Sequence, residues 1–437
     1  MKHLTKLLIM CLAFICVNVY SSDELKIIID RGIEKTLPIA VIPFAWDRSP
    51  QQPPVDFALT ISNDLARSGR FAPMQEQDLP QRPTEFPQIN FKDWRLLGME
   101  TLVIGKLKQI PDGNYEVEFR LVDVYRGEQI SGFSIKSTPR QLRRTAHRIS
   151  DVIFEKLTGI KGAFDTRIAY ITVTRRQDGN KRYNLQIADA DGFNPQILLD
   201  SKQPLMSPAW SPDGKRLAYV SFEGGSSAVY VQDILTGERT RIAANEGINS
   251  APAWSPDGSR LAVTLSKDGN PEIYVIHLSS GTLQRITYNG AIDTEPDWSR
   301  DGARLAFTSD RGGTPQIYTV EMLSGKTQRL TFDGSYNARP RYSPDGNSLA
   351  LIHATAGAYQ IALLNIKGGY LNILTDSRLD ESPSFAPNSS MIMYATSTRR
   401  GSELAAVSVD GRVHQRLALQ IGEVREPAWG PFPAASE

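Results

Sequence analysis

Ser207-Pro-Ala-Trp-Ser-Pro-Asp-Gly-Lys-Arg-Leu-Ala-Tyr-Val220 is the stretch that decides the fold, because the chain repeats it at a fixed interval. The aromatic residue of each copy falls at positions 210, 254, 298, 342, 385 and 429, so the steps are 44, 44, 44, 43 and 44 residues. A repeat of about 40–45 residues that holds four short strands is a propeller blade. Six copies of this WD40-like repeat therefore predict an all-β six-bladed β-propeller.

The order of signals inside each copy is constant. A Pro-x-aromatic strand leads into a Pro-Asp-Gly turn, in which Pro presets φ and Gly accepts a positive φ. Three further strands follow in each repeat. We interpret the turn aspartates (Asp213, Asp257, Asp301, Asp345) as turn residues rather than as a catalytic or metal-binding ring. The aromatic residues are interpreted as packing between blades.

The two ends of the repeat array complement each other. Residues 167–199 supply three strands with no Pro-x-aromatic strand before them, whereas Pro427-Ala-Trp429 supplies such a strand with nothing after it. We predict a propeller over residues 165–431 in which the C-terminal strand is the innermost strand of the first blade. That arrangement removes the two open sheet edges.

The first residues of the chain have the pattern of a secretory signal peptide. Lys2 and Lys6 precede an uncharged apolar run of 13 residues, Leu7–Val19, and small Ser21 and Ser22 follow. Such a run is too short to span a bilayer, so we expect residues 1–21 to be a cleaved signal peptide. No later apolar run is long enough either, so the mature chain is not expected to span a membrane.

Charge and cysteine usage restrict the compartment and the partners. Lys plus Arg is 49 and Asp plus Glu is 48, so no net field favours nucleic acid. Both cysteines, Cys11 and Cys16, lie inside the expected signal peptide. A cysteine-free exported protein suits a bacterial periplasm.

Residues 22–160 predict a small α/β N-terminal domain. Strands are expected at 37–44, 101–108, 115–121 and 130–136, and helices at 56–68, at 91–97 and from Thr138, with Pro139 at its first position, to residue 158. We expect the helices to cover one face of the sheet. The mobile N-terminal segment 22–33 favours a strand, either an edge strand of the body or one that adds to a partner.

Enzyme motifs are missing from the sequence. A serine hydrolase needs Gly-x-Ser-x-Gly at a strand-to-helix turn, and the nearest string, Gly224-Gly-Ser-Ser-Ala228, lacks the last Gly. The four histidines of the mature part form no His-Glu-x-x-His motif. We therefore expect no enzyme activity.

The loops that enter the innermost strands should gather at one mouth of the propeller channel. They carry polar residues beside a few large side chains, a composition that suits binding of a loop or peptide and equally an ordinary solvated surface. Their carboxylates leave open a cation such as calcium in the channel, and no other cofactor is expected. The candidate binding residues are Met206, Asn249, Asp293, Thr294, Glu295, Asn337, Arg339, Asp380, Glu381 and Arg425.

Two strings and the domain order carry a family resemblance. They are Phe154-Glu-Lys-Leu-Thr-Gly-Ile-Lys-Gly-Ala-Phe164 and Gln203-Pro-Leu-Met-Ser-Pro-Ala-Trp-Ser-Pro-Asp-Gly214. With the signal peptide, the α/β domain and the six repeats, the chain closely resembles the TolB family of the Gram-negative Tol–Pal system. The departures are local, since Arg300 replaces a turn Pro and Asn388-Ser389 replaces an Asp-Gly.

The resemblance implies a periplasmic, non-enzymatic protein that maintains outer-membrane integrity and supports cell division. It implies that the lipoprotein Pal binds at the propeller mouth, chiefly at 249, 293–295, 337 and 339, and that other outer-membrane lipoproteins, porins or colicins are further partners. It also implies that TolA contacts the N-terminal segment Asp23, Glu24, Leu25, Lys26, Ile27, Ile28, Ile29, Asp30 and Arg31. The competing hypothesis is a periplasmic propeller enzyme or glycan-binding protein that uses the same mouth.

Overall fold

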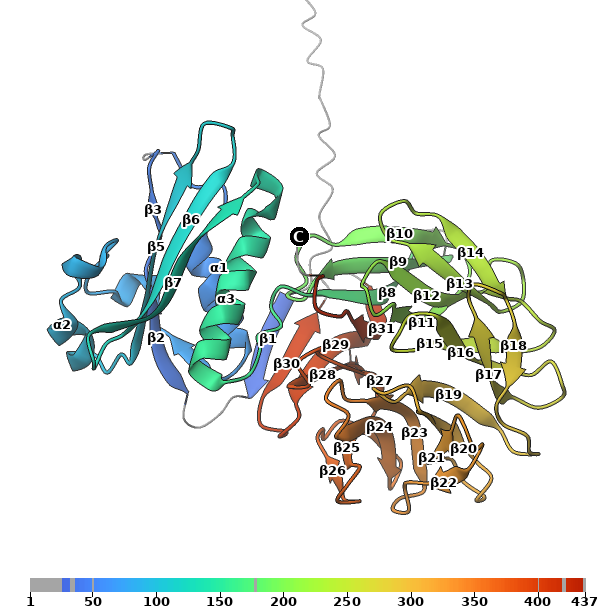
Figure 1. Cartoon of the computed structure of the whole chain (residues 1–437). Helices are drawn as coiled ribbons and strands as arrows, with labels where there is room; N and C mark the ends of the chain where they lie inside the picture. The colour runs from blue at the N-terminus through green and yellow to red at the C-terminus, as the bar shows by residue number, and fades with distance from the viewer. Residues whose placement is uncertain are drawn as a thin grey trace, which may run out of the picture.

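The computed structural model describes residues 26–31, 36–48, 51–176, 179–399, 401–418 and 422–434. The expected signal peptide and residues 22–25 lie outside the described residues. In the part that is described, no helix has both the length and the apolar character needed to cross a membrane. The chain forms an N-terminal α/β region beside a β-propeller (Figure 1).

The N-terminal region is built on one mixed sheet with the strand order β4-β2-β5-β6-β7, and β3 pairs with β5. β2 is parallel to β4 and β5, whereas β5, β6 and β7 are antiparallel neighbours. The strands are β2 (Leu37–Val41), β3 (Ala45–Trp46), β4 (Phe71–Pro73), β5 (Thr101–Gln109), β6 (Tyr115–Asp123) and β7 (Glu128–Ser137).

Two helices cover one face of this sheet. α1 (Phe57–Arg67) begins where the Asp56 carboxylate accepts the N–H of Leu59 at 2.9 Å, which is an N-cap. α3 (Leu142–Thr158) ends at Gly159, whose φ of 74° is left-handed. Apolar side chains of both helices and of alternate β6 positions form one core.

The expectation that all helices cover one face is wrong for α2 (Phe91–Leu96). Its Trp94 is fully buried on the opposite face, against Ile42, Leu102 and Ile104. The reason is that β2 and β5 are apolar on both faces, so the second face also needs a cover. Two 3₁₀ turns, η1 (Glu76–Asp78) and η2 (Phe86–Gln88), precede α2 in the chain.

The start of α3 also differs from the expectation. Pro139–Gln141 forms a 3₁₀ turn, η3, before the α-helix begins at Leu142. The hydroxyl of Thr138 donates to the side chain of Gln141 at 2.9 Å instead of accepting a helix N–H. The helix boundary therefore lies one turn later than the cap signal predicted.

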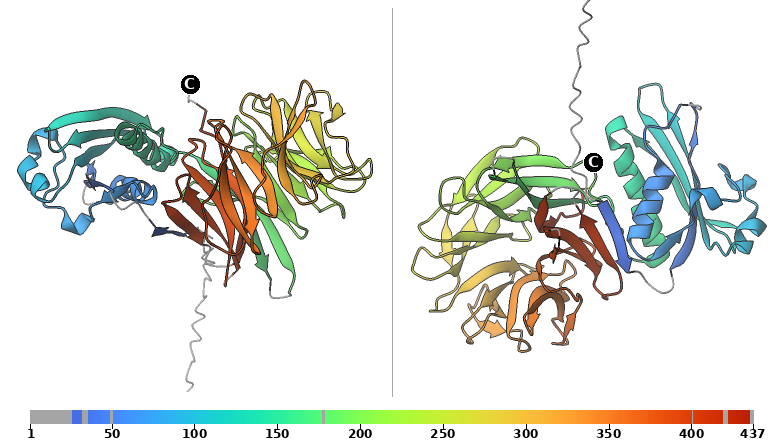
Figure 2. Two further views of the ribbon diagram at one scale, coloured as in Figure 1. Left: turned by 90° about the horizontal axis from the view of Figure 1, so that it is seen from below. Right: turned by 180° about the vertical axis from the view of Figure 1, so that it is seen from behind.

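The described residues form six four-stranded antiparallel blades, which Figure 2 shows from two further sides. Blades 2 to 6 take their strands in chain order, from the innermost outward. The strands of blades 2, 3 and 4 are β11 (Leu205–Trp210), β12 (Arg216–Ser221), β13 (Ala228–Asp233), β14 (Arg239–Ala243), β15 (Asn249–Trp254), β16 (Arg260–Leu265), β17 (Glu272–His277), β18 (Leu283–Arg285), β19 (Asp293–Trp298), β20 (Arg304–Ser309), β21 (Gln316–Glu321) and β22 (Thr327–Arg329). Those of blades 5 and 6 are β23 (Tyr336–Tyr342), β24 (Ser348–Thr355), β25 (Ala358–Asn365), β26 (Leu371–Ile373), β27 (Asp380–Phe385), β28 (Met391–Thr398), β29 (Gly401–Ser408) and β30 (His414–Ala418).

Blade 1 joins the two ends of the repeat array, as predicted. It consists of β8 (Arg167–Arg175), β9 (Lys181–Asp189) and β10 (Gln196–Ser201), with the C-terminal β31 (Glu423–Trp429) paired to β8 as the innermost strand. The pairing is antiparallel, with Arg425 opposite Ile171. The ring is thus closed by residues from both ends of the propeller sequence.

The repeated tryptophans and aspartates act as scaffold. Trp254 Nε1 donates to the carbonyl of Ala209 in the preceding blade at 3.1 Å, and the Arg216 guanidinium stacks on the Trp254 ring at 4.6 Å. Trp298, with Ala253 and Arg260, repeats this arrangement one blade further on. Each repeat therefore packs on its neighbour through the side chains that define it.

The N-terminal segment adds to the propeller. β1 (Lys26–Arg31) pairs antiparallel with β30 and makes blade 6 a five-stranded sheet, with Ile27 opposite Leu417. In Figure 1 this strand lies between α3 and β30. Of the two expectations for this segment, the structure has the edge strand on the body.

Candidate functional site at the propeller mouth

Four of the predicted mouth residues are fully buried rather than exposed. Asn249, Asp293, Asn337 and Asp380 occupy equivalent positions at the starts of the innermost strands, and each has an exposed fraction of 0%. A side chain that solvent cannot reach does not contact a partner in this conformation. We therefore correct the expectation that these four side chains contact a partner directly.

Hydrogen bonds show how these side chains hold the loops. Asn249 Oδ1 accepts the N–H of Asn245 at 2.8 Å, and its Nδ2 donates to the Asn245 carbonyl at 2.7 Å. Asp293 Oδ2 accepts from Arg311 at 2.6 Å and from Asn289 at 2.7 Å. The bonds to Asn245 and Asn289 fix loops that lead into innermost strands, and the bond to Arg311 fixes the β20–β21 loop beside them.

Asn337 does the same in blade 5. Asn337 Nδ2 donates to the carbonyl of Asp333 at 2.7 Å, and Asn337 Oδ1 lies 2.9 Å from His353 Nδ1. Burial raises the pKa of Asp380, although the hydroxyl groups of Ser377 and Thr375 oppose the shift. Sequence shows that these positions are polar, but polarity alone does not reveal that they point inward.

A second ring of six equivalent residues lies directly before the repeated prolines. All six have left-handed φ angles between 49° and 58°, which is uncommon for residues other than glycine. The pairing register of the innermost strand shifts at this point in every blade. The ring consists of Ser207, Ala251, Glu295, Arg339, Ser382 and Glu426.

Arg339 binds three other residues of this ring, which belong to different blades around the channel. Its Nε donates to Glu295 at 2.6 Å, and its terminal nitrogens bind Ser382 and, at 3.2 Å, Glu426. The three charged side chains are only 15–20% exposed. Burial alone would lower the pKa of Arg339, but Glu426 and Glu295 outweigh it and raise the pKa above its ordinary value.

This network limits the carboxylate oxygens that the expected cation could use in the channel. Glu295 and Glu426 are carboxylates of the channel, and the guanidinium of Arg339 supplies positive charge to both from within the chain. Glu295 Oε2 also accepts from Thr308 at 3.1 Å. A calcium ion in the channel stays a prediction, and it would have to share these oxygens with Arg339.

Several large apolar side chains are exposed at the mouth. Met206, Ile248, Ile292 and Leu379 are 39–49% exposed, and Tyr359, 37% exposed, meets Tyr336 edge to face with ring centroids 5.4 Å apart. A cavity of about 460 Å³ opens beside Met206 and Ile248 and reaches Thr294, Glu295 and Arg339. Thr294 and Glu381 are half-buried, and exposed Arg425 pairs with Glu423 at 2.5 Å.

Sequence reasoning missed most of this apolar rim, although a signal exists. A large apolar residue stands directly before the buried polar residue in four repeats: Ile248-Asn249, Ile292-Asp293, Tyr336-Asn337 and Leu379-Asp380. Neighbouring residues of a strand point to opposite sides, so a buried polar residue leaves its neighbour outside. The rim could have been found from this pairing.

A second polar cluster lies between the N-terminal region and blade 1. His147 of α3 lies 2.7 Å from Asp64 of α1 and 3.7 Å from Asp191 of the β9–β10 loop. Burial alone would lower the pKa of His147, but Asp64 and Asp191 raise it. Arg67 and Arg143 also contact these carboxylates, so the cluster is an ion-pair network that joins the two parts rather than an open metal site.

Comparison with known proteins agrees with this architecture. The family described as "TolB beta propeller domain" matches residues 154–433, and the "TolB amino-terminal domain" matches residues 25–130. A Tol-Pal system protein TolB of Thioalkalivibrio sulfidiphilus is 60% identical over 96% of this chain and 97% of its own length. One of Nitrosococcus oceani is 63% identical over 93% of both chains.

A solved structure shows the same arrangement. The crystal structure of TolB from Acinetobacter baumannii has a TM-score of 0.87 and 41% identity, and the match covers 93% of this chain and all of that one. Fold and mouth thus define a closed six-bladed propeller with an α/β region in front. The chain belongs to the TolB family of Tol-Pal system proteins.

Proposed function

We propose that the chain is a periplasmic, non-enzymatic interaction protein that binds Pal through the propeller mouth. The observation that carries this proposal is the exposed apolar rim of Met206, Ile248, Ile292 and Leu379, of which Met206 and Ile248 line a cavity. Apolar anchors surrounded by polar groups are the composition of protein-binding hot spots. Hydrogen bonds of buried Asn249, Asp293 and Asn337 hold three of the loops that carry this rim.

We further propose that the N-terminal segment, residues 22–33, binds TolA. Its docked form is β1, held by backbone pairing to β30 at the outer edge of blade 6. A strand at a sheet edge can exchange one partner for another without disturbing the blade beneath it. In this role the protein links Pal to TolA, and so contributes to outer-membrane integrity and cell division.

The Pal proposal is tested with purified Pal and the mature chain. A Met206→Asp, Ile292→Asp double variant removes two rim anchors, and we expect its affinity for Pal to fall at least tenfold. The matched control is Leu235→Asp with Leu323→Asp, because both leucines are fully exposed in turns at the opposite end of their blades. Unchanged binding by the rim variant would move the site away from the mouth.

A peptidoglycan fragment serves as the competing ligand in the same assay. Binding of that fragment at the rim, without binding of Pal, would support a glycan-binding protein instead.

The TolA proposal is tested by deleting residues 22–33, which should abolish TolA binding. If Pal binding biases the docking of this segment, the deletion also changes Pal affinity, since coupling between two sites is reciprocal; equal affinities rule the coupling out.

A further inference from the structure

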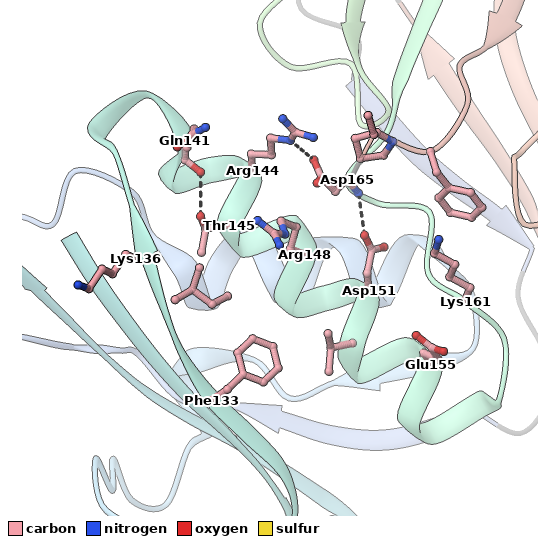
Figure 3. Close-up of a pocket in the computed structure, with 15 residues that line it drawn as sticks. Phe133, Lys136, Gln141, Arg144, Thr145, Arg148, Asp151, Glu155, Lys161 and Asp165 are labelled. Atoms are coloured by element: carbon pink, nitrogen blue, oxygen red, sulfur yellow. Dashed lines mark hydrogen bonds and ion pairs between the residues drawn. The ribbon is translucent and has the colours of Figure 1, made fainter. Parts of the chain in front are cut away.

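A groove of about 580 Å³ runs along the outer side of α3, far from the mouth. Figure 3 shows it between β7 and the segment that leads into the propeller, with Lys136 and Phe133 on one wall and Lys161 and Asp165 on the other. The residues that follow β31, Phe432–Ala434, close one side. Its volume is in the range of ligand-binding pockets.

One wall of the groove is a sheet edge that has no strand beside it. β7 is the last strand in the order β4-β2-β5-β6-β7, so within the described residues its outer edge has no pairing partner. Phe133 on this edge is 42% exposed and packs edge to face on Phe119 of β6, with ring centroids 4.6 Å apart. A long unpaired edge is a place where an extended chain can add by backbone hydrogen bonds.

The groove carries more positive than negative charge. Its cations are Lys136, Arg144, Arg148 and Lys161, and its acids include exposed Glu155 and mostly buried Asp165. Among the described residues, neither Lys136 nor Arg148 forms an ion pair, whereas Arg144 uses its Nε on Asp165 at 2.7 Å. The two terminal nitrogens of Arg144 are left for a ligand.

The third acid of the groove, Asp151, has a reduced negative charge below about pH 7. Burial raises the pKa of Asp151 to about 7, and its oxygens accept the N–H groups of Phe164 and Asp165 at 2.7 and 3.2 Å. Asp151 is therefore largely protonated in mildly acidic solution. The electrostatic field of the groove favours an anionic ligand.

The spacing of the arginines matches an added strand. Arg144 and Arg148 stand four residues apart on α3, which places them about 6 Å apart along the helix axis. Alternate residues of an extended chain point to the same side at intervals of about 6.6 Å. Carboxylates at alternate positions of a chain paired with β7 would therefore meet both guanidinium groups, a strong kind of contact.

We propose that this groove binds an extended acidic segment of a partner protein, which adds as a strand to the free edge of β7 and places alternate carboxylates on Arg144 and Arg148. Phe133 offers apolar contact to the segment, and Lys136 and Lys161 hold its ends. This surface is separate from both the propeller mouth and β1. The protein therefore has a third interaction surface, on its N-terminal region.

The probe is a fluorescent peptide of about eight residues, the length of a typical strand, that alternates Glu and Val. It is titrated with the mature chain, and a Lys/Val peptide of equal length is the charge control. We expect the Glu/Val peptide to bind at least tenfold more tightly, with an affinity that falls as salt rises. Equal binding of the two peptides, or no binding at about 1 mM peptide, overturns the proposal.

Matched variants locate the site. Lys136→Glu with Arg148→Glu should weaken binding of the Glu/Val peptide at least tenfold. The control pair Lys92→Glu with Arg126→Glu makes the same charge change at exposed positions outside the groove and should bind as the wild type does. If both pairs of substitutions weaken peptide binding equally, the effect is one of net charge and the proposal is overturned. Thermal unfolding of each variant checks that it is folded.

Strand addition is tested separately by disulfide trapping. Ser134 lies on β7 with an exposed side chain, and the mature chain has no cysteine of its own. The probes are peptides that each carry one cysteine, at successive positions. Ser134→Cys should form a disulfide with the peptides whose cysteine lies at every second position, and not with the peptides whose cysteine lies at the positions in between. Trapping without this alternation would overturn the strand geometry.

Discussion

Arg339 Nε lies 2.6 Å from Glu295 Oε1, and the same guanidinium reaches Glu426, so one side chain joins three blades at the centre of the ring. Both carboxylates depend on it for their charge balance, because all three side chains are mostly buried. Removing one partner of a buried ion pair leaves an uncompensated charge.

Arg339→Met is therefore expected to destabilise the propeller by about 3–5 kcal/mol. Adding Glu295→Gln and Glu426→Gln should restore much of the loss, because the uncompensated charges are gone. Urea unfolding measures both variants. Arg425→Met, which breaks an exposed pair with Glu423, is the control and should cost no more than about 1 kcal/mol; an equal cost at both sites would contradict the role of the network.

The His147 cluster predicts a loss of stability with rising pH. The folded state raises the pKa of His147, so its stabilising charge is fully present below the unfolded pKa of about 6.5 and is lost as pH rises through the higher folded value. His147→Gln should flatten the pH dependence of unfolding in that window. His277→Gln, outside the cluster, should leave the dependence unchanged, and a wild-type stability that rises with pH there would contradict the assignment.

Asp151 predicts a second change at lower pH. Its folded pKa of about 7 exceeds the ordinary value of 3.8, so the folded state holds a proton that the unfolded chain has lost. Stability contributed by this site therefore falls as pH rises between about 4 and 7.

Asp151→Asn keeps an acceptor for the N–H of Phe164 and removes the titration. We expect it to stabilise the protein at pH 8 by an amount on the order of 2 kcal/mol. The measurement is thermal unfolding at acid and alkaline pH. Glu155→Gln, exposed one turn along α3, is the control, and an Asp151→Asn variant that is less stable at pH 8 would refute the prediction.

The closing strand predicts a cooperative failure on truncation. Deleting residues 424–437 removes nearly all of β31 and exposes the edge of β8 and the neighbouring innermost strands. We expect the propeller to unfold as a whole or to aggregate. A chain that ends at Ala434 is the control, and unchanged thermal unfolding of the longer truncation would disprove closure by β31.

The repeat period and the orphan strand at Trp429 were sufficient to predict the number of blades and their closure, because both are local patterns repeated at known intervals. The sequence predicts only part of the docking of β1. Ile27 and Ile29 favour a strand, but the choice of β30 as its partner depends on how the N-terminal region sits against blade 6. The contact between Gly69 and Val413 belongs to that packing: a Cβ on Gly69 would lie 2.5 Å from a Val413 methyl group.

The mouth was predicted less completely than the fold. The polarity and loop position of Asn249 and Asp293 predict surface contacts, yet both side chains point inward and bind their own loops. Ile248 and Ile292, one residue earlier, are exposed, and the sequence indicates this orientation only through the pairing of each with a buried polar neighbour. Arg339 was selected as a surface contact, and its left-handed backbone and position at the channel axis appear only in three dimensions.

Closure by β31 also has a consequence for the order of events during folding. Trp429 Nε1 donates to the hydroxyl of Thr166, a residue 263 positions earlier in the chain. The first blade lacks its innermost strand until nearly the whole polypeptide has been made. Until then the other five blades stand next to a sheet with an unpaired edge at β8. Contacts of such long range form slowly, and we expect the final residues to set the moment at which the ring becomes resistant to proteases.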